Sequence, residues 1–177
     1  MNHFLLPRVI SNHELEENTD PVTNSLHDFM KPWKNTTSYS IDLESLLKEY
    51  SITYERILRN EEPSGLYDVI LDSLQNLSLL QYQKEGGSYI AMLKDTSSPD
   101  MIQYIYKICS CYKKVYLSKP DNDCPTSCTK YIIAMNYTNS PQSGNLKIPY
   151  YFRMKLDDMN SMFGQTQLEH LRFQDKL

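Results

Sequence analysis

The chain has 177 residues, of which 40% are hydrophobic and 23% are charged; this suits one globular domain with a tail and leaves no room for two enzyme domains. Its 18 Lys and Arg against 22 Asp and Glu give a formal net charge of -4, which excludes a basic nucleic-acid-binding surface over the whole molecule and leaves room for a local patch. No apolar stretch reaches the roughly 20 residues that cross a bilayer, and Met1–Arg8 lacks the basic and apolar parts of a signal peptide. We therefore expect an intracellular protein, in the cytoplasm or the nucleus, without a membrane span.

Residues 1–40 are expected to form an irregular arm. They carry Pro7, Pro21 and Pro32 among many polar residues and show no sustained hydrophobic period. Trp33, the single tryptophan, is expected to anchor this arm where it docks.

Two helices are predicted over residues 41–85. From Ile41 to Leu58 the apolar residues recur at steps of three and four, which predicts one amphipathic helix with a bend near 51–53. Ser64 is placed to cap a second helix over 65–85. Gly86 is expected to end that helix in a left-handed conformation.

Residues 88–137 predict an α/β architecture. Three β-prone runs, Ser88–Leu93, Lys114–Leu117 and Lys130–Tyr137, are separated by a helix that Ser98 caps with Pro99 in its first turn and by a polar loop. This order places two strands around a crossover helix, followed by an antiparallel return.

The last part of the chain is expected to leave the sheet. Ile148–Met154 is aromatic and β-prone, and Pro149 would confine it to an edge strand. The tail from Asp157 looks helical, with enough apolar residues to pack back on the domain. The predicted organisation is an arm over 1–40, an α/β domain over 41–155 and a helical tail over 156–177.

Four motifs follow one another in a specific order between residues 64 and 137. They are Gly86-Gly87 before the strand Ser88-Tyr89-Ile90-Ala91, the helix from Ser98, the strand end Ser118-Lys119-Pro120, and Tyr131-Ile132-Ile133-Ala134. In this order and spacing they resemble the C-terminal half of the FtsJ-like (RrmJ-like) ribose 2'-O-methyltransferases. The resemblance implies a partial Rossmann-like methyltransferase fold, with S-adenosylmethionine as cofactor and a ribose hydroxyl of RNA as acceptor.

The family's chemistry relies on a lysine, aspartate, lysine and glutamate tetrad, because a ribose hydroxyl is a poor nucleophile that needs an oriented lysine beside it. The resemblance places the second lysine at Met92 and the glutamate at Thr129, so neither position keeps an ionisable group. Lys94, two residues beyond Met92, is the remaining candidate for a catalytic lysine. Asp68 and Asp72 are expected to be solvated on the surface of the predicted second helix.

The family's glycine-rich cofactor loop has no counterpart in residues 1–64, which contain no glycine. The chain therefore resembles a degenerate relative without the usual cofactor-binding half. We expect no bound cofactor, and S-adenosylmethionine only if the chain is active.

Two further residue groups suggest binding chemistry. Four cysteines, Cys109, Cys111, Cys124 and Cys128, have a poor spacing for zinc and are expected to be free thiols, with no metal site. Lysines interleaved with tyrosines form the one concentrated basic region; its candidate RNA-binding residues are Lys113, Lys114, Lys119 and Lys130. The alternative for this region is a solvated helix end and strand edge.

Three functions follow from these patterns. The leading hypothesis is a non-catalytic methyltransferase-like protein that acts as a binding or regulatory subunit in RNA methylation or capping, with a methyltransferase or capping subunit as its partner and RNA as a possible ligand. The first alternative is a divergent, active S-adenosylmethionine-dependent RNA 2'-O-methyltransferase that uses Lys94. The second is an unrelated protein-interaction adaptor.

Overall fold

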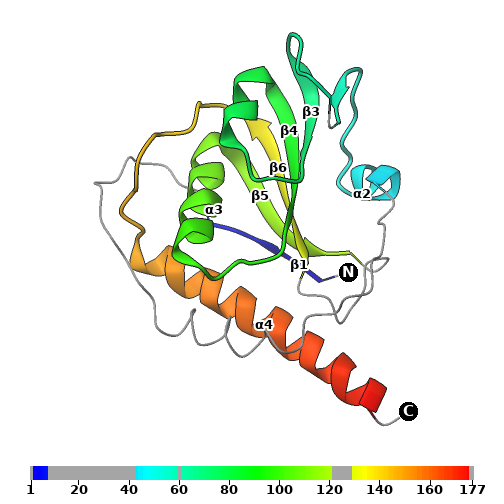
Figure 1. Ribbon diagram of the computed structural model, residues 1–177, viewed down its shortest axis with the longest axis vertical. Helices are drawn as coiled ribbons and strands as arrows, with labels where there is room; N and C mark the ends of the chain where they lie inside the picture. The colour runs from blue at the N-terminus through cyan, green and yellow to red at the C-terminus, as the bar shows by residue number, and fades with distance from the viewer. Residues whose placement is uncertain (1, 8–42, 60, 121–128, 176–177) are drawn as a thin grey trace.

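The computed structural model describes residues 2–7, 43–59, 61–120 and 129–175, and these form an α/β fold with a mixed six-stranded sheet. Three α-helices accompany the sheet within these ranges: α2 (Leu43–Glu49), α3 (Pro99–Cys111) and α4 (Tyr150–Asp175) (Figure 1). The strands are β1 (Asn2–Leu5), β2 (Ile57–Leu58), β3 (Tyr67–Asp72), β4 (Gln83–Leu93), β5 (Tyr112–Lys119) and β6 (Lys130–Tyr137). The predicted α/β class is confirmed at this level.

The sheet has the strand order β1-β5-β6-β4-β3-β2. Strands β2, β3 and β4 are parallel neighbours, whereas β6 is antiparallel to both β4 and β5. Consequently β4 and β5 run in the same direction with β6 between them. The predicted antiparallel return is therefore confirmed, and it lies between the two strands that precede it.

Side chains on the two faces of the sheet pack into separate apolar clusters. Ile70, Tyr89 and Leu117 belong to the cluster that contains the buried residues of α3 and α4. Val69 and Ile90 belong to the other cluster, which contains Leu46 and Leu47 of α2. Because neighbouring residues of a strand point to opposite faces, we call these two sides the α3/α4 face and the α2 face.

The predicted helix over 41–58 is wrong beyond Glu49. Helix α2 ends there, and Ser51 has a φ of 56°, a left-handed conformation that does not continue a helix. Ile57 and Leu58 instead pair with Val69 and Ile70 of β3. The three- and four-residue spacing arises because both a short helix and the following extended segment bury apolar residues on the sheet.

The predicted helix over 65–85 is also wrong. This segment contains β3, a 3-10 helix η2 (Leu77–Tyr82) and the start of β4. Strand β3 lies between β2 and β4 with apolar clusters on both sides. A strand buried on both faces has a nearly continuous apolar sequence, which periodicity does not separate from a buried helix.

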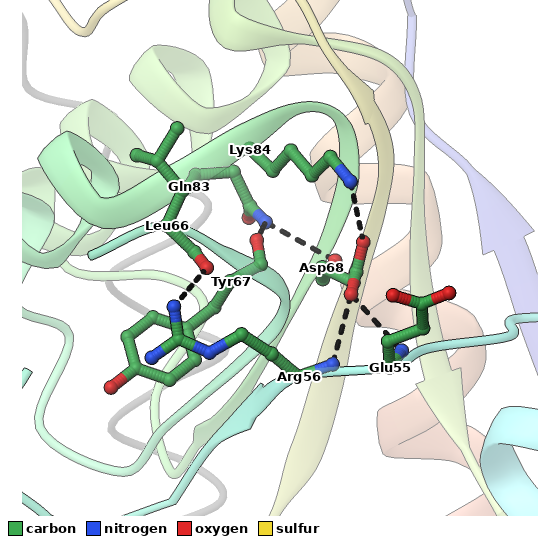
Figure 2. A network of polar contacts seen from close by, with 7 residues as sticks. All are labelled: Glu55, Arg56, Leu66, Tyr67, Asp68, Gln83 and Lys84. Carbon is green, nitrogen blue, oxygen red and sulfur yellow. Dashed lines mark hydrogen bonds and ion pairs between the residues drawn. The ribbon is translucent and has the colours of Figure 1, made fainter. Parts of the chain in front are cut away.

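A polar network ties the loop before β2 to the amino-terminal end of β3 (Figure 2). The Asp68 carboxylate accepts hydrogen bonds from the backbone N–H groups of Glu55 at 3.0 Å and Arg56 at 2.9 Å, and Lys84 Nζ lies 3.6 Å from it. The register of β4 shifts here, from Tyr67 opposite Gln83 to Val69 opposite Ser88. A Cβ on Gly87 would meet the Asp68 carbonyl oxygen at 2.7 Å, so glycine is required for this close approach.

For the two helices after β4, the structure confirms part of what the sequence predicts. Ser98 caps α3 by accepting a hydrogen bond from the Met101 N–H, with Pro99 in the first turn, as predicted. The predicted edge strand over 148–154 is wrong, because α4 begins at Tyr150, directly after Pro149, a residue whose fixed φ suits a helix start. Farther along α4, Met159 and Phe163 are buried, so the predicted helical tail does pack back on the domain.

Most of the predicted arm, including Trp33, lies outside the described residues. At the start of the arm the prediction of an irregular segment is wrong, because Asn2–Leu5 form β1 and pair antiparallel with β5. Among the described residues, no helix is both long and apolar enough to cross a membrane.

Candidate functional site

The carboxyl ends of β2, β3 and β4 meet at one edge of the sheet, which is where ligands usually bind in parallel α/β structures. A half-open cavity of about 320 Å³ lies at this edge. Its lining residues come from α2, the three strand ends and β6, and they are Leu43, Arg59, Leu71, Asp72, Ser73, Ile90, Met92 and Tyr131.

The floor of the cavity is apolar and lies on the α2 face. Leu71 is the register partner of Ile90, and Met92 is the register partner of Tyr131, so these side chains form neighbouring pairs across β3, β4 and β6. All four belong to the apolar cluster that includes α2. This lining favours an apolar or aromatic group over a phosphate or a metal ion.

Arg59 brings a positive charge to the cavity. Its guanidinium donates a hydrogen bond to Glu44 Oε1 at 3.1 Å, and the Tyr54 hydroxyl donates to the same oxygen at 3.1 Å. Arg59 and Glu44 are both exposed, so their ion pair is screened by water and contributes little to stability. Its role is to orient the Arg59 side chain beside the opening.

Asp72 ends β3 and is buried, with 5% of its surface exposed, so the prediction of a solvated helix-surface carboxylate is wrong. Its Oδ2 accepts hydrogen bonds from the Tyr89 hydroxyl and the Asn76 N–H, both at 2.6 Å. Its Oδ1 accepts from the Leu74 N–H at 2.9 Å. The carboxylate thus holds the turn after β3 and the hydroxyl of a tyrosine on the next strand.

The polar chain continues from Tyr89 to Tyr104 of α3, whose hydroxyl oxygens lie 2.6 Å apart. Since the Tyr89 proton is directed at Asp72, Tyr104 donates to Tyr89. Burial raises the pKa of both tyrosines, so both hydroxyl groups remain protonated donors at neutral pH. The Asp72–Tyr89–Tyr104 chain is therefore a structural link between β3, β4 and α3.

The positions that the methyltransferase resemblance singled out lie on or just beyond the adjoining ends of β4 and β6. Met92 lines the cavity with its thioether side chain. Lys94 is exposed just past the end of β4 and lies outside the set of residues that line the cavity. The Thr129 carbonyl accepts a hydrogen bond from Lys119 Nζ at 2.7 Å.

The predicted basic region is divided by the fold. Lys113 and Lys114 are exposed and Lys119 is half-buried, whereas Lys130 is 8% exposed with its Nζ 5.3 Å from the centre of the Phe163 ring. Most tyrosines interleaved with these lysines are buried in the core: Tyr104, Tyr106, Tyr112 and Tyr131. Tyr116 is half-buried on β5.

Cys109 and Cys111 are buried free thiols. Burial raises the pKa of Cys109, and it raises the pKa of Cys111 to about 11, so neither is a thiolate at neutral pH. Cys124 and Cys128 lie outside the described residues. No group of three or more metal-binding side chains occurs among the residues that the structure describes.

Sequence reasoning missed the cavity residues Arg59, Leu71 and Ile90, and also the placement of His3 and Tyr50 beside Tyr116. The available signal for the cavity was the strand-like run before Asp72, which ends in a carboxylate and the polar segment Ser73–Asn76. The contact of His3 with Tyr50 joins residues distant in sequence, and no local pattern predicts it.

No protein-family model matches the chain. An uncharacterized protein of Acanthamoeba polyphaga mimivirus is 26% identical over 150 residues, which are 80% of this chain and 41% of the viral protein. The chain thus spans well under half the length of this relative.

Proposed function

We propose that the chain is a methyltransferase-like protein of the FtsJ type that does not catalyse methyl transfer and acts as a binding or regulatory subunit in RNA methylation or capping. The observation that carries the proposal is the position of β6, antiparallel and between β4 and β5. The resemblance implies a strand, a helix, a second strand and a further strand in this order, and β4, α3, β5 and β6 follow the same order. The parallel β3 and β4 precede β5 and β6 in the chain.

The sequence motifs follow the order that the resemblance implies, with one departure: Gly86-Gly87 lie within β4, and the helix expected before them is replaced by β3, η2 and the start of β4. Gly86-Gly87 lie at the register shift between β3 and β4. Helix α3 connects β4 to β5, and β5 ends at Lys119, directly before Pro120. Tyr131 lies in β6, opposite Met92. The motifs after Gly87 agree with the strand order, and this agreement supports the proposed family resemblance.

The chemistry of the cavity supports a non-catalytic role. Proton transfer from a ribose hydroxyl needs an ionisable group within hydrogen-bond reach. At the family's lysine position the cavity has Met92, and Asp72 uses its carboxylate on Tyr89 and two backbone N–H groups. The guanidinium of Arg59 offers only N–H donors and no acceptor for a proton.

The cavity lining also does not fit S-adenosylmethionine. Binding this cofactor calls for close backbone approach at glycine and for acceptors toward its ribose and amino groups. The lining is mainly apolar, and the described glycines nearest to this part of the sheet, Gly86 and Gly87, lie in the register shift at the amino-terminal end of β3. We therefore derive no reaction step through the cofactor.

The test is a methyl-transfer assay on the purified full chain. Labelled S-adenosylmethionine and capped RNA are supplied, an active ribose 2'-O-methyltransferase is the positive control, and cofactor binding is measured by calorimetry. We expect neither transfer nor binding from this chain alone. Transfer that disappears in Lys94→Ala and persists in Lys113→Ala, the matched exposed lysine, would contradict the proposal and establish an active enzyme.

A further inference from the structure

Three aromatic rings meet at the β1/β5 edge of the α2 face. The rings of His3 on β1, Tyr116 on β5 and Tyr50, directly after α2, have centroids 5.3 to 5.8 Å apart. We call these three residues the aromatic triad. His3 is exposed and the two tyrosines are half-buried, so the triad presents ring surface to solvent among the described residues.

Strand register places the triad on one side of the sheet. His3 is the register partner of Ser118 and Leu5 of Tyr116. Phe4, between them, points to the other side, where its ring contacts Phe163 of α4 at 5.0 Å. His3 and Leu5 therefore share the α2 face, and Leu5 is 48% exposed there.

Lys114 adds a positive charge to the same surface. It is exposed and lies two residues before Tyr116 on β5, so strand alternation places both side chains on the α2 face. Lys155 is also exposed, but it lies on α4, which packs on the opposite face. Lys114 and Lys155 therefore offer a matched pair of exposed lysines on opposite sides of the sheet.

We propose that the aromatic triad and Lys114 form a binding surface for single-stranded RNA. Unpaired bases stack on tyrosine and histidine rings, and an adjacent lysine contacts the phosphate backbone. The choice of RNA as the ligand rests on the proposed role in RNA methylation or capping. The surface lies on β1, β5 and the residue directly after α2, away from the strand ends that form the cavity. We therefore expect it to bind RNA without catalysing a reaction.

The charges at this surface predict the character of the binding. Lys114 is an exposed lysine beside the triad, and the carboxylate of Glu49 lies close enough to raise the pKa of Tyr50, after the larger effect of burial. Phosphate neutralisation by one lysine is weak, so stacking supplies most of the affinity. Duplex RNA, whose bases are already stacked and paired, is expected to bind much more weakly.

The experiment measures binding of the full chain to a fluorescent single-stranded RNA of about 10 nucleotides, within the usual site sizes, by anisotropy at several salt concentrations. His3→Ala removes an exposed ring and is expected to weaken binding by about 5- to 150-fold, the range for loss of one stacked base. Tyr116→Leu is a second test that keeps the apolar contact with the sheet.

Lys114→Gln and Lys155→Gln form the matched pair. Loss of one phosphate contact lowers the slope of log affinity against log salt by about 0.7, and we expect this for Lys114→Gln alone. Three outcomes would each overturn the proposal. The salt slope could change equally in the two lysine variants, the affinity could stay unchanged in both His3→Ala and Tyr116→Leu, or the wild-type chain could fail to bind RNA. The methyl-transfer assay is separate, so RNA binding can fail while the proposed lack of catalysis stands.

Discussion

The two faces of the sheet differ in how they are covered. On the α3/α4 face, helices of 13 and 26 residues pack against the strands, and Ile70, Tyr89 and Leu93 are fully buried there. On the α2 face the described cover is a helix of 7 residues, beside which lie both the cavity and the aromatic triad. Stability is therefore expected to come mainly from the first face and binding from the second.

The difference also separates two kinds of polar group. On the α3/α4 face the Asp72–Tyr89–Tyr104 chain is buried, and each oxygen in it has a hydrogen-bond partner. On the α2 face, Arg59 and Lys114 are exposed, and Arg59 is paired with the exposed Glu44. Buried polar groups must be satisfied within the fold, whereas exposed ones can exchange water for a bound molecule.

The largest expected effect compares two adjacent residues of β3 that point to opposite faces. Ile70→Ala removes a fully buried side chain on the α3/α4 face and should lower the free energy of unfolding by about 2–5 kcal/mol. Leu71→Ala enlarges a cavity that is already open, and should cost about 1 kcal/mol because part of the side chain is exposed. Urea unfolding measures both, and equal losses would show that the faces contribute alike.

The next effect tests the buried polar chain. In Asp72→Asn the amide nitrogen cannot accept the hydrogen bonds that the Tyr89 hydroxyl and the Asn76 N–H donate to Oδ2, so we expect a loss of about 1.5–3 kcal/mol in unfolding free energy. Tyr89→Phe removes the donor, and the double variant should lose less than the sum of the two single variants. Additive losses would mean that Asp72 stabilises the fold only through its hydrogen bonds to the turn after β3 and not through Tyr89.

The part of the fold from β4 to β6 could be predicted from sequence because local signals agreed there. Ser98 and Pro99 specify the start of α3, a glycine pair precedes the core of β4, and β6 has the bounds that its apolar run indicated. Order alone also indicated the antiparallel return. The position of β6 between β4 and β5 depends on hydrogen-bonded pairing of residues that are distant in sequence, and no local pattern predicts it.

Residues 41–85 were misread for a physical reason. Strand β3 packs against apolar clusters on both faces, so Val69, Ile70 and Leu71 form a continuous apolar run without the alternation of a half-buried strand. With this segment assigned to a helix, Asp72 is predicted to be solvated, and the cavity at the carboxyl end of β3 is not predicted. The Met92 and Thr129 positions came from the family resemblance, and the structure adds that Met92 lines the cavity.

The smallest expected effect concerns Asp68, which shares β3 with Asp72 but lies at its more exposed end. Hydrogen bonds from the backbone N–H groups of Arg56 and Glu55, and then the charge of Lys84, lower the pKa of Asp68 below its ordinary value. A carboxyl group whose folded pKa is lowered stabilises the fold above its unfolded pKa of about 4, and this stabilisation is lost as the pH falls through the folded value.

The gap between the urea midpoints of wild type and Asp68→Asn should therefore be widest near neutral pH and narrow steadily below about pH 4. Lys84→Gln should reduce this pH dependence only in part, because the backbone donors act more strongly than the lysine. If Lys84→Gln abolished it, the exposed ion pair rather than the loop before β2 would hold the Asp68 carboxylate.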